Sequence, residues 1–223
     1  MKFVLLSAPE SDAAISAIRH VLGNTAGAIR IGYLASSHEP DRRYYRQMQT
    51  YYQQFGADLC CYVDLEQDFS LQTFEQLCQC DVIHLAGGDT YRFLKGVQER
   101  KVAQQLCAFS MAGGGFIGLS AGAMLLCPSI ESATLCGDQN GVELSDMAGL
   151  QLIPYQFIPH IDKTDNGVNA ALAAAEHLCS QALARFPAIL CADDDAVIFD
   201  KGSLLGFGSP LLFDGLQLLS INK

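Results

Sequence analysis

The sequence predicts an α/β fold in which a mostly parallel sheet is covered by helices on both faces. Short apolar runs rich in β-branched residues alternate five times with longer segments of helical period. This alternation is typical of repeated β-α units. Half of the 223 residues are hydrophobic and no linker or internal repeat interrupts the chain. We therefore expect residues 1–223 to form a single three-layer α/β domain.

The first half of the chain supplies the expected parallel core. The strands are expected at residues 2–6, 29–34, 58–63, 82–85 and 115–119. The helices between and beside them are expected at residues 11–22, 41–55, 70–78, 91–96 and 101–112. Strand and helix order of this kind favours a parallel sheet.

The second half of the chain predicts a different arrangement. Residues 151–158 look extended, residues 168–183 form an Ala-rich helical pattern, and short strands are expected at 188–191, 196–199 and 203–206. The last two strands are joined by Asp200-Lys201-Gly202, which is a hairpin signal. We expect antiparallel strands at the edge of the parallel core.

Charge and hydropathy argue against some classes of binding partner. Fourteen basic against twenty-four acidic residues give a net charge of −10, which repels nucleic acid and anionic membranes. The cluster Arg42, Arg43 and Arg46 could contact bases, but a solvated helix face explains it more simply. No apolar run reaches the roughly 18 residues of a membrane span, and residues 1–7 suit a strand better than a signal peptide. We expect a cytoplasmic protein without nucleic-acid or membrane partners.

The nine cysteines do not predict a disulfide framework or a metal site. Their number is odd and they are scattered through apolar segments, as is typical of reduced core residues. Cys60, Cys61, Cys78 and Cys80 are close in sequence, but adjacent strand residues point to opposite faces and no C-x-x-C pair is present. We expect neither a metal nor a cofactor.

The strongest motif is Gly118-Leu119-Ser120-Ala121-Gly122, which lies between an apolar strand and a helical segment. A G-x-S-x-G sequence in this context predicts a nucleophile elbow, a sharp turn that exposes a serine at the strand tip. Glycines two positions either side of the serine allow the neighbouring elements to approach closely. Ser120 is therefore the candidate nucleophile.

A serine nucleophile needs a histidine base within hydrogen-bond reach. His160 closes the extended, proline-containing run 153–160, so it is expected at a strand end, where the active sites of open α/β sheets lie. A structural role as a strand cap is the alternative. The other histidines lie in expected helices, a loop and a buried strand: His20, His38, His84 and His177.

The sequence predicts the acid and the oxyanion hole of a hydrolytic site less clearly than its serine and histidine. A carboxylate should orient the histidine, and the residues alone leave five candidates: Glu131, Asp138, Glu143, Asp146 and Asp162. An oxyanion hole needs backbone N–H groups, one from Ala121 and a second from the glycine loop 86–90. A phosphate-binding loop is the rival interpretation of residues 86–90, but neither G-x-G-x-x-G nor G-K-[ST] is present.

Three ordered motifs resemble one known family. Residues 31–37 (IGYLASS), 86–94 (AGGDTYRFL) and 118–123 (GLSAGA), followed by Pro159-His160, are similar to the peptidase E family of serine peptidases, which includes aspartyl dipeptidases and cyanophycinase-like enzymes. The resemblance spans nearly the whole chain. It implies a class I glutamine amidotransferase-like, flavodoxin-like fold.

The resemblance also implies roles for residues. Ser120 would be the nucleophile, His160 the base, Gly88 and Ala121 the oxyanion donors, and Asp138 the acid, with Glu131 as its alternative. It implies a small-peptide substrate, as in a dipeptidase or related exopeptidase, and a homodimer. It also implies a preference for aspartate, as in the aspartyl dipeptidases, although residues 160–166 resemble the shorter members of the family. Residues 193–195 (DDD) could bind a substrate amine, but they are better explained as a solvated turn.

Two other function classes compete with a serine hydrolase. Glutamine amidotransferases use cysteine at the elbow, because a thiolate pairs readily with histidine, so Ser120 argues against that activity. A catalytically silent binding domain could keep the elbow for its backbone geometry alone. That alternative predicts that His160 and a carboxylate lie far from Ser120.

Overall fold

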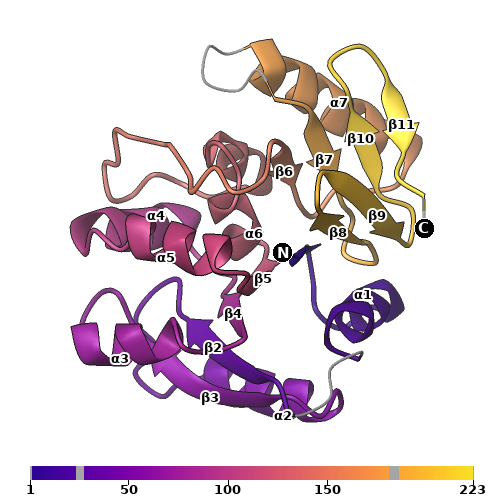
Figure 1. The fold of residues 1–223 in the computed structure, drawn as a ribbon. Coiled ribbons are helices and arrows are strands. Elements are labelled where there is room, and N and C mark those ends of the chain that lie inside the picture. Colours follow the sequence, from indigo (N-terminus) through magenta and orange to yellow (C-terminus); the bar gives the residue numbers. More distant parts are fainter. Residues whose placement is uncertain (1, 24–27, 181–185, 223) are drawn as a thin grey trace.

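The computed structural model describes residues 2–23, 28–180 and 186–222 (Figure 1). Its larger sheet has seven strands in the order β3-β2-β4-β5-β1-β8-β9. The five parallel strands are β1 (Lys2–Leu6), β2 (Arg30–Leu34), β3 (Asp58–Val63), β4 (Val82–Leu85) and β5 (Gly115–Leu119). The antiparallel strands β8 (Ala196–Asp200) and β9 (Ser203–Phe207) complete one edge. The predicted parallel core with an antiparallel edge is confirmed.

Helices cover both faces of this sheet. α1 (Asp12–Leu22) and α2 (Arg43–Gln53) bury their apolar sides against one face. α3 (Leu71–Leu77), α4 (Thr90–Glu99) and α5 (Ala103–Met111) pack on the other face, together with the short α6 (Ala121–Leu125). The expected three-layer α/β architecture is therefore present, with helix ends displaced by a few residues from the expected positions.

A second, four-stranded sheet was not predicted. Its order is β11-β10-β7-β6, and its strands are β6 (Gln156–Ile158), β7 (Ala188–Leu190), β10 (Leu211–Phe213) and β11 (Leu218–Ser220). Each strand has only three residues, too few to produce a clear period. Figure 1 shows this sheet beside α7 (Asp165–Ser180), at the end of the molecule opposite β2 and β3. The expected end of that helix at residues 181–183 lies outside the described residues.

The connection between β8 and β9 follows the expected turn chemistry. Asp200 pairs with Ser203, which leaves Lys201 and Gly202 as the two loop residues. Their φ angles are 50° and 87°, and a type I′ hairpin requires positive φ at both positions. The predicted hairpin is confirmed.

A stacked row of rings crosses β3, β2 and β4 on the face covered by α2. The Tyr33 ring lies between Tyr62 and His84, with centroid distances of 5.9 and 5.1 Å. His84 is 1% exposed, and its Nδ1 lies 2.9 Å from the hydroxyl oxygen of Tyr52 on α2. Burial lowers the pKa of His84 to about 3. The imidazole is therefore neutral at physiological pH and serves as part of the core.

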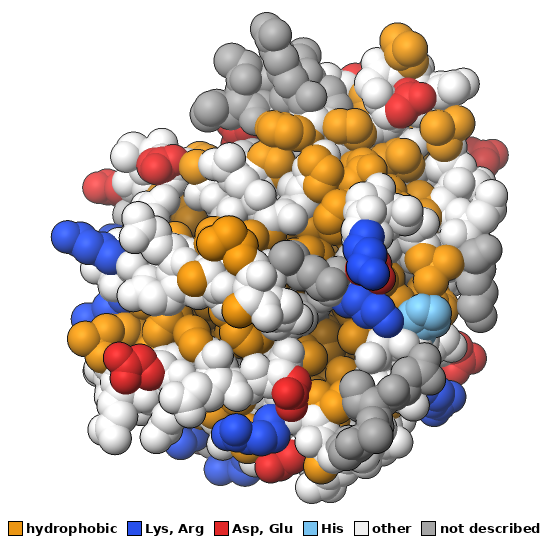
Figure 2. Space-filling view, viewed as in Figure 1, with side chains coloured by type: hydrophobic (Ala, Val, Ile, Leu, Met, Phe, Trp, Pro, Cys, Tyr) orange, Lys and Arg blue, Asp and Glu red, His pale blue; other side chains and the backbone are white. Residues whose placement is uncertain are grey.

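The surface carries charges of both signs, and the described cysteines are free. Within the described part of the chain, no helix is both long and apolar enough to span a bilayer. Figure 2 shows acidic and basic side chains interspersed on the face drawn there. The eight cysteines that the structure describes are free thiols, and four of them are buried: Cys61, Cys80, Cys127 and Cys191.

We expect acidification to destabilise the fold partly through His84. Between pH 6.5 and about 3 the unfolded chain binds a proton at this residue and the folded chain does not, so the free energy of unfolding should fall as the pH falls through this window. The double variant Tyr52→Phe/His84→Phe removes both hydrogen-bond partners and should lose this part of the pH dependence.

Urea unfolding of both proteins at pH 7 and pH 4 measures the difference. The carboxylates contribute equally to both proteins, so they cancel in the comparison. Equal losses of stability in the two proteins would show that His84 does not resist protonation in the folded state.

Candidate active site

Ser120 occupies the single position between β5 and α6. Its φ and ψ angles are 47° and −105°, a conformation that costs a non-glycine residue about 1–3 kcal/mol and that concentrates at functional sites. Three backbone hydrogen bonds hold it: Ser120 N–H donates to Leu6 O at 2.7 Å, and Ser120 O accepts from Ala123 N and Met124 N at 3.0 Å. The hydroxyl is thus presented at the carboxyl end of the sheet on a rigid turn.

The two glycines of the motif are required by close packing. A Cβ at Gly118 would lie 2.6 Å from Cα of Ala123, and a Cβ at Gly122 would collide with the carbonyl oxygen of Leu85. The first contact lies within the turn and the second is between α6 and β4. Any side chain at either position would push the helix away from the strands, so the G-x-S-x-G pattern follows from the geometry.

The structure brings His160 and Asp193 to Ser120. Ser120 Oγ lies 2.9 Å from His160 Nε2, and His160 Nδ1 lies 2.5 Å from Asp193 Oδ1. Ser120 is half-buried, whereas the side chains of His160 and Asp193 are 40% and 66% exposed. A hydroxyl, an imidazole and a carboxylate in this order form the arrangement that activates a serine nucleophile.

Ser7, directly after β1, ties the two loops of this arrangement together. Its buried hydroxyl donates to Cys191 O at 3.0 Å and accepts from His160 N–H at 3.4 Å. Ile161 N–H also donates to Cys191 O at 3.1 Å. The residues that carry His160 and Asp193 are therefore anchored on each other and on the end of β1. Sequence reasoning did not single out Ser7.

The expected acid, Asp138, lies elsewhere. Its Oδ2 accepts from Thr90 Oγ1 at 2.6 Å and from Thr90 N–H at 3.2 Å, so it stabilises the start of α4. Asp193 is the carboxylate whose hydrogen bond to His160 the structure describes, and the expectation that Asp138 contacts His160 needs this correction. The physical reason is topological, because the loop that carries Asp138 packs on α4 whereas His160 follows β6.

Three of the other four candidate carboxylates have local partners. Glu131 accepts from Ser129 Oγ at 3.0 Å, and Asp146 accepts from Ala148 N–H at 3.0 Å. Asp162 accepts from both the N–H and the hydroxyl of Thr164 at 2.9 Å. Each of these contacts shapes a turn within a few residues of the carboxylate.

A signal for Asp193 was present in the predicted topology. β8 is antiparallel to β1, and Ala196 pairs with Leu6 at its start. Residues just before β8 therefore lie at the carboxyl ends of the parallel strands, beside Ser120. The three aspartates at 193–195 occupy this position, and the solvated-turn interpretation overlooked it.

Asp195 fixes the loop that carries Asp193. Its side chain is fully buried and accepts from Ala192 N–H at 3.0 Å, Ser209 N–H at 2.6 Å and Lys163 Nζ at 2.9 Å. Lys163 also pairs with Asp194 at 2.6 Å. Partial burial opposes the charge on Lys163, but these two carboxylates outweigh it and raise its pKa. Lys163 thus holds the loop before β8 through two of its three aspartates.

Gly88 and Ala121 are the expected oxyanion donors. Gly88 lies in the loop after β4, and Ala121 follows the neighbouring strand β5. Gly88 has φ of 125° and precedes α4, and a Cβ there would collide with Ser36 Oγ. The position therefore requires glycine. Gly87 packs against Leu119, the residue before the nucleophile. Ala121 is the first residue of α6, so its N–H has no acceptor within the helix.

A cavity of about 830 Å³ opens beside this turn. Its lining comes from the ends of β2 and β4, from α2 and from the loops after β1 and β2. Gly87, Gly88 and Leu119 form the wall nearest Ser120. The cavity therefore lies next to the elbow, although Ser120 itself is not among its lining residues.

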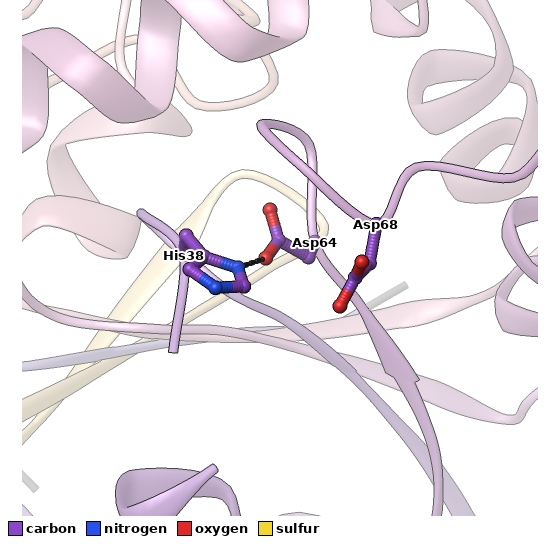
Figure 3. A group of neighbouring side chains, drawn as sticks. All are labelled: His38, Asp64 and Asp68. Carbon is purple, nitrogen blue, oxygen red and sulfur yellow. Dashed lines mark hydrogen bonds and ion pairs between the residues drawn. The ribbon is translucent and has the colours of Figure 1, made fainter. Parts of the chain in front are cut away.

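One group of side chains in the described part of the chain has the spacing of a metal site. Ligand atoms of His38, Asp64 and Asp68 lie within 4.8 Å of one another. Figure 3 shows Asp64 facing His38, whose Nδ1 is 2.5 Å from Asp64 Oδ2. Asp64 Oδ1 also accepts from Glu66 N–H at 2.7 Å. These internal contacts account for Asp64, and we assign no metal to the group.

The cysteines near β3 and β4 do not form a comparable group. Cys60 Sγ and Cys80 Sγ are 3.9 Å apart, whereas Cys61 Sγ donates to Thr73 O on the other face. Burial raises the pKa of Cys61 to about 11 and that of Cys80 to about 12. Both thiols stay protonated at neutral pH, which disfavours metal binding.

Two solved structures share this fold. A candidate peptidase E from Listeria monocytogenes EGD-e superimposes with a TM-score of 0.73 at 16% identity, covering 92% of this chain and 96% of its own. A peptidase from an acI-B1 Actinobacterium superimposes with a TM-score of 0.63 at 15% identity, covering 99% and 93% of the two chains. At these identities the likeness establishes the fold.

Sequence relatives with the name peptidase E align with a shorter part of the chain. The chain is 33% identical over 84 residues to peptidase E of Citrobacter koseri, which covers 38% of this chain and 35% of the relative. Peptidase E of Salmonella typhimurium LT2 is 33% identical over 82 residues, or 37% and 34% of the two chains. The alignments thus span about a third of the length of these relatives.

A family model covers far more of the chain than these pairwise alignments. The model of peptidase family S51 matches residues 4–205. That range includes the elbow at Ser120, the base candidate His160 and the loop with Asp193. The chain belongs to peptidase family S51.

Proposed function

We propose that this protein is a serine peptidase that hydrolyses small peptides through an acyl-enzyme on Ser120. The observation that carries the proposal is the continuous contact from Ser120 Oγ to His160 Nε2 and from His160 Nδ1 to Asp193. Membership of a peptidase family and the strained backbone of Ser120 support it. The alternative of a catalytically silent domain expected these side chains to lie apart, so the geometry disfavours it.

In the first half of the reaction His160 Nε2 takes the proton of Ser120 Oγ as the oxygen attacks the peptide carbonyl carbon. The carbonyl oxygen becomes an oxyanion, for which the N–H groups of Gly88 and Ala121 are the proposed donors. Asp193 accepts from Nδ1–H, holds the tautomer and stabilises the imidazolium. His160 then gives its proton to the leaving amine as the C–N bond breaks, which leaves an ester on Ser120.

In the second half a water molecule replaces the amine. His160 takes a proton from the water while its oxygen attacks the ester carbonyl, and the same N–H groups face the oxyanion. The proton then passes from His160 to Ser120 Oγ as the ester bond breaks. The carboxylic acid product leaves, and the hydroxyl and neutral imidazole are restored.

Charge around the cavity mouth supports a substrate with a free α-amino group. Glu10, Glu39 and Asp41 line the cavity together with Arg43, and this excess of carboxylates attracts an ammonium group. We therefore propose a dipeptidase or related exopeptidase. The aspartate preference that the family resemblance implies stays a prediction, which a comparison of kcat/KM for dipeptides with Asp, Asn or Leu on the acyl side tests.

We expect Ser120→Ala to abolish turnover, with a loss in kcat of about 10⁶-fold. The substitution removes the only atom that can form the acyl-enzyme and leaves the fold intact. A fluorophosphonate probe followed by peptide mapping measures this directly, with label expected on Ser120 of the wild type and absent from the variant. Equal labelling of both proteins would remove Ser120 from the mechanism.

We expect Asp193→Asn to lower kcat/KM by about 100-fold or more, because an amide cannot stabilise the imidazolium or hold its tautomer. Asp138→Asn is the matched control, since Asp138 contacts Thr90 and not His160. It should reduce thermal stability and leave kcat/KM within a few-fold of the wild type. A larger loss of kcat/KM in the Asp138 variant would reverse the assignment of the acid.

A further inference from the structure

Two cysteine sulfurs meet near one edge of the larger sheet. Cys60 Sγ, on the edge strand β3, lies 3.9 Å from Cys80 Sγ, which is two residues before β4. Other described cysteine sulfurs contact carbonyl oxygens instead, those of Thr73, Ala123, Leu150 and Pro159. Because the two sulfurs are already neighbours, small side-chain rotations can bring them to the bonding distance of a disulfide, about 2.05 Å.

The backbone around this pair explains how sulfurs from opposite sides of β2 can meet. β2 lies between β3 and β4 in the sheet. The register between β2 and β3 shifts between Ile31 and Gly32, so Cys60 is an extra residue of β3 without a partner on β2. Gly32 leaves room for the other sulfur, because a Cβ there would lie 3.3 Å from Cys80 Sγ and 2.5 Å from Leu77. The irregular strand and the missing side chain together make space for the pair.

The two thiols differ in accessibility and share a cation. Cys60 is exposed, whereas Cys80 is buried. Arg30, the exposed first residue of β2, has a raised pKa, and its hydrogen bond to Cys60 is the largest cause. A cation beside a sulfur stabilises the thiolate, which is the reactive form. An oxidant in solution therefore reaches Cys60 first, and Cys80 is the enclosed thiol beside it, as in redox-sensitive pairs with a resolving cysteine.

The reactivity of Cys80 depends on the state of Cys60. Burial raises the pKa of Cys80 to about 12, and the charge of Cys60 and its hydrogen bond add to the rise. Both of these contributions disappear once Cys60 is bonded to another sulfur, while Arg30 continues to favour the Cys80 thiolate. Reaction at Cys60 thus prepares Cys80 for the second step.

We propose that Cys60 and Cys80 form a reversible intramolecular disulfide. The Cys60 thiolate attacks one sulfur of a small-molecule disulfide such as glutathione disulfide, which gives a mixed disulfide and releases one thiol of the reagent. Cys80 loses its proton to water and attacks the Cys60 sulfur, and the second thiol of the reagent leaves. The two cysteines lose two electrons and the reagent disulfide gains them.

The bond closes residues 60–80 into a loop that contains α3, which packs beside β3 (Figure 1). A cross-link of this kind restricts the unfolded chain. We expect the oxidised protein to melt about 5–10 °C higher than the reduced protein. No described contact joins the pair to Ser120, His160 or Asp193, so this inference does not depend on the proposed function.

Oxidation of the reduced, folded protein with glutathione disulfide tests the pairing. Cleavage after Glu66 and Glu75 places Cys60 and Cys80 in different peptides, so mass spectrometry without reduction detects a bond between them. The expected product is the two peptides joined, lighter than their sum by two hydrogen atoms. Dithiothreitol should separate them and restore the lower melting temperature.

Variants identify which thiols take part. Cys60→Ser and Cys80→Ala should each abolish the cross-link. Cys61→Ser and Cys78→Ser are the matched controls, because these residues lie in the same two peptides, and both variants should keep the cross-link. Arg30→Gln should slow its formation several-fold, since the cation beside Cys60 is lost. Thermal melting of the reduced variants checks that each is folded.

The possible outcomes are distinct. A cross-link that requires both Cys60 and Cys80 and raises the melting temperature supports the inference. A mixed disulfide that persists on Cys60, a bond that requires Cys61 or Cys78 instead, or a failure of any thiol to react overturns it. An oxidised protein that melts no higher than the reduced one overturns the stabilising role. Peptide hydrolysis enters none of these measurements, so they succeed or fail independently of the proposed function.

Discussion

The close packing of α6 on β4 and β5 is the constraint on which the site depends. Because Gly118 and Gly122 have no side chains, α6 can begin with only one residue between it and β5, and it packs so close to β4 that a Cβ on Gly122 would collide with the carbonyl oxygen of Leu85. Ser120 then has no room for an ordinary turn and adopts positive φ. All five residues of α6 are buried, and their packing, together with the hydrogen bond from Ser120 N–H to Leu6 O, offsets the strain.

The rest of the site assembles because several chain segments end at the same edge of the sheet. The carboxyl ends of the parallel strands present Ser7, Gly88 and Ser120 side by side. β8 runs antiparallel to β1, so its start reaches the same edge and delivers Asp193. The second sheet contributes His160 after β6, and Ser7 joins it to Cys191. The proposed nucleophile, base and acid, which come from three distant segments, thus share one small region.

The contrast between two histidines shows how environment decides function. His160 is exposed, stands on a loop and contacts a hydroxyl and a carboxylate. His84 is enclosed by rings, and burial keeps it neutral, so it can donate one hydrogen bond but cannot serve as a base at neutral pH. Of the two, only His160 is placed to exchange a proton with Ser120 in the proposed reaction.

Local patterns in the sequence determined the five parallel strands, the helices between them, the hairpin at Lys201-Gly202 and the elbow at Ser120. His160 was also identifiable, because the proline-containing run before it excludes helix. The partner of His160 was decided only by the tertiary structure, as were the second sheet and the role of Asp138 at Thr90. The physical reason is that periodicity and turn chemistry act between residues close in sequence. Which carboxylate meets an imidazole depends instead on strand pairing between segments far apart in the chain.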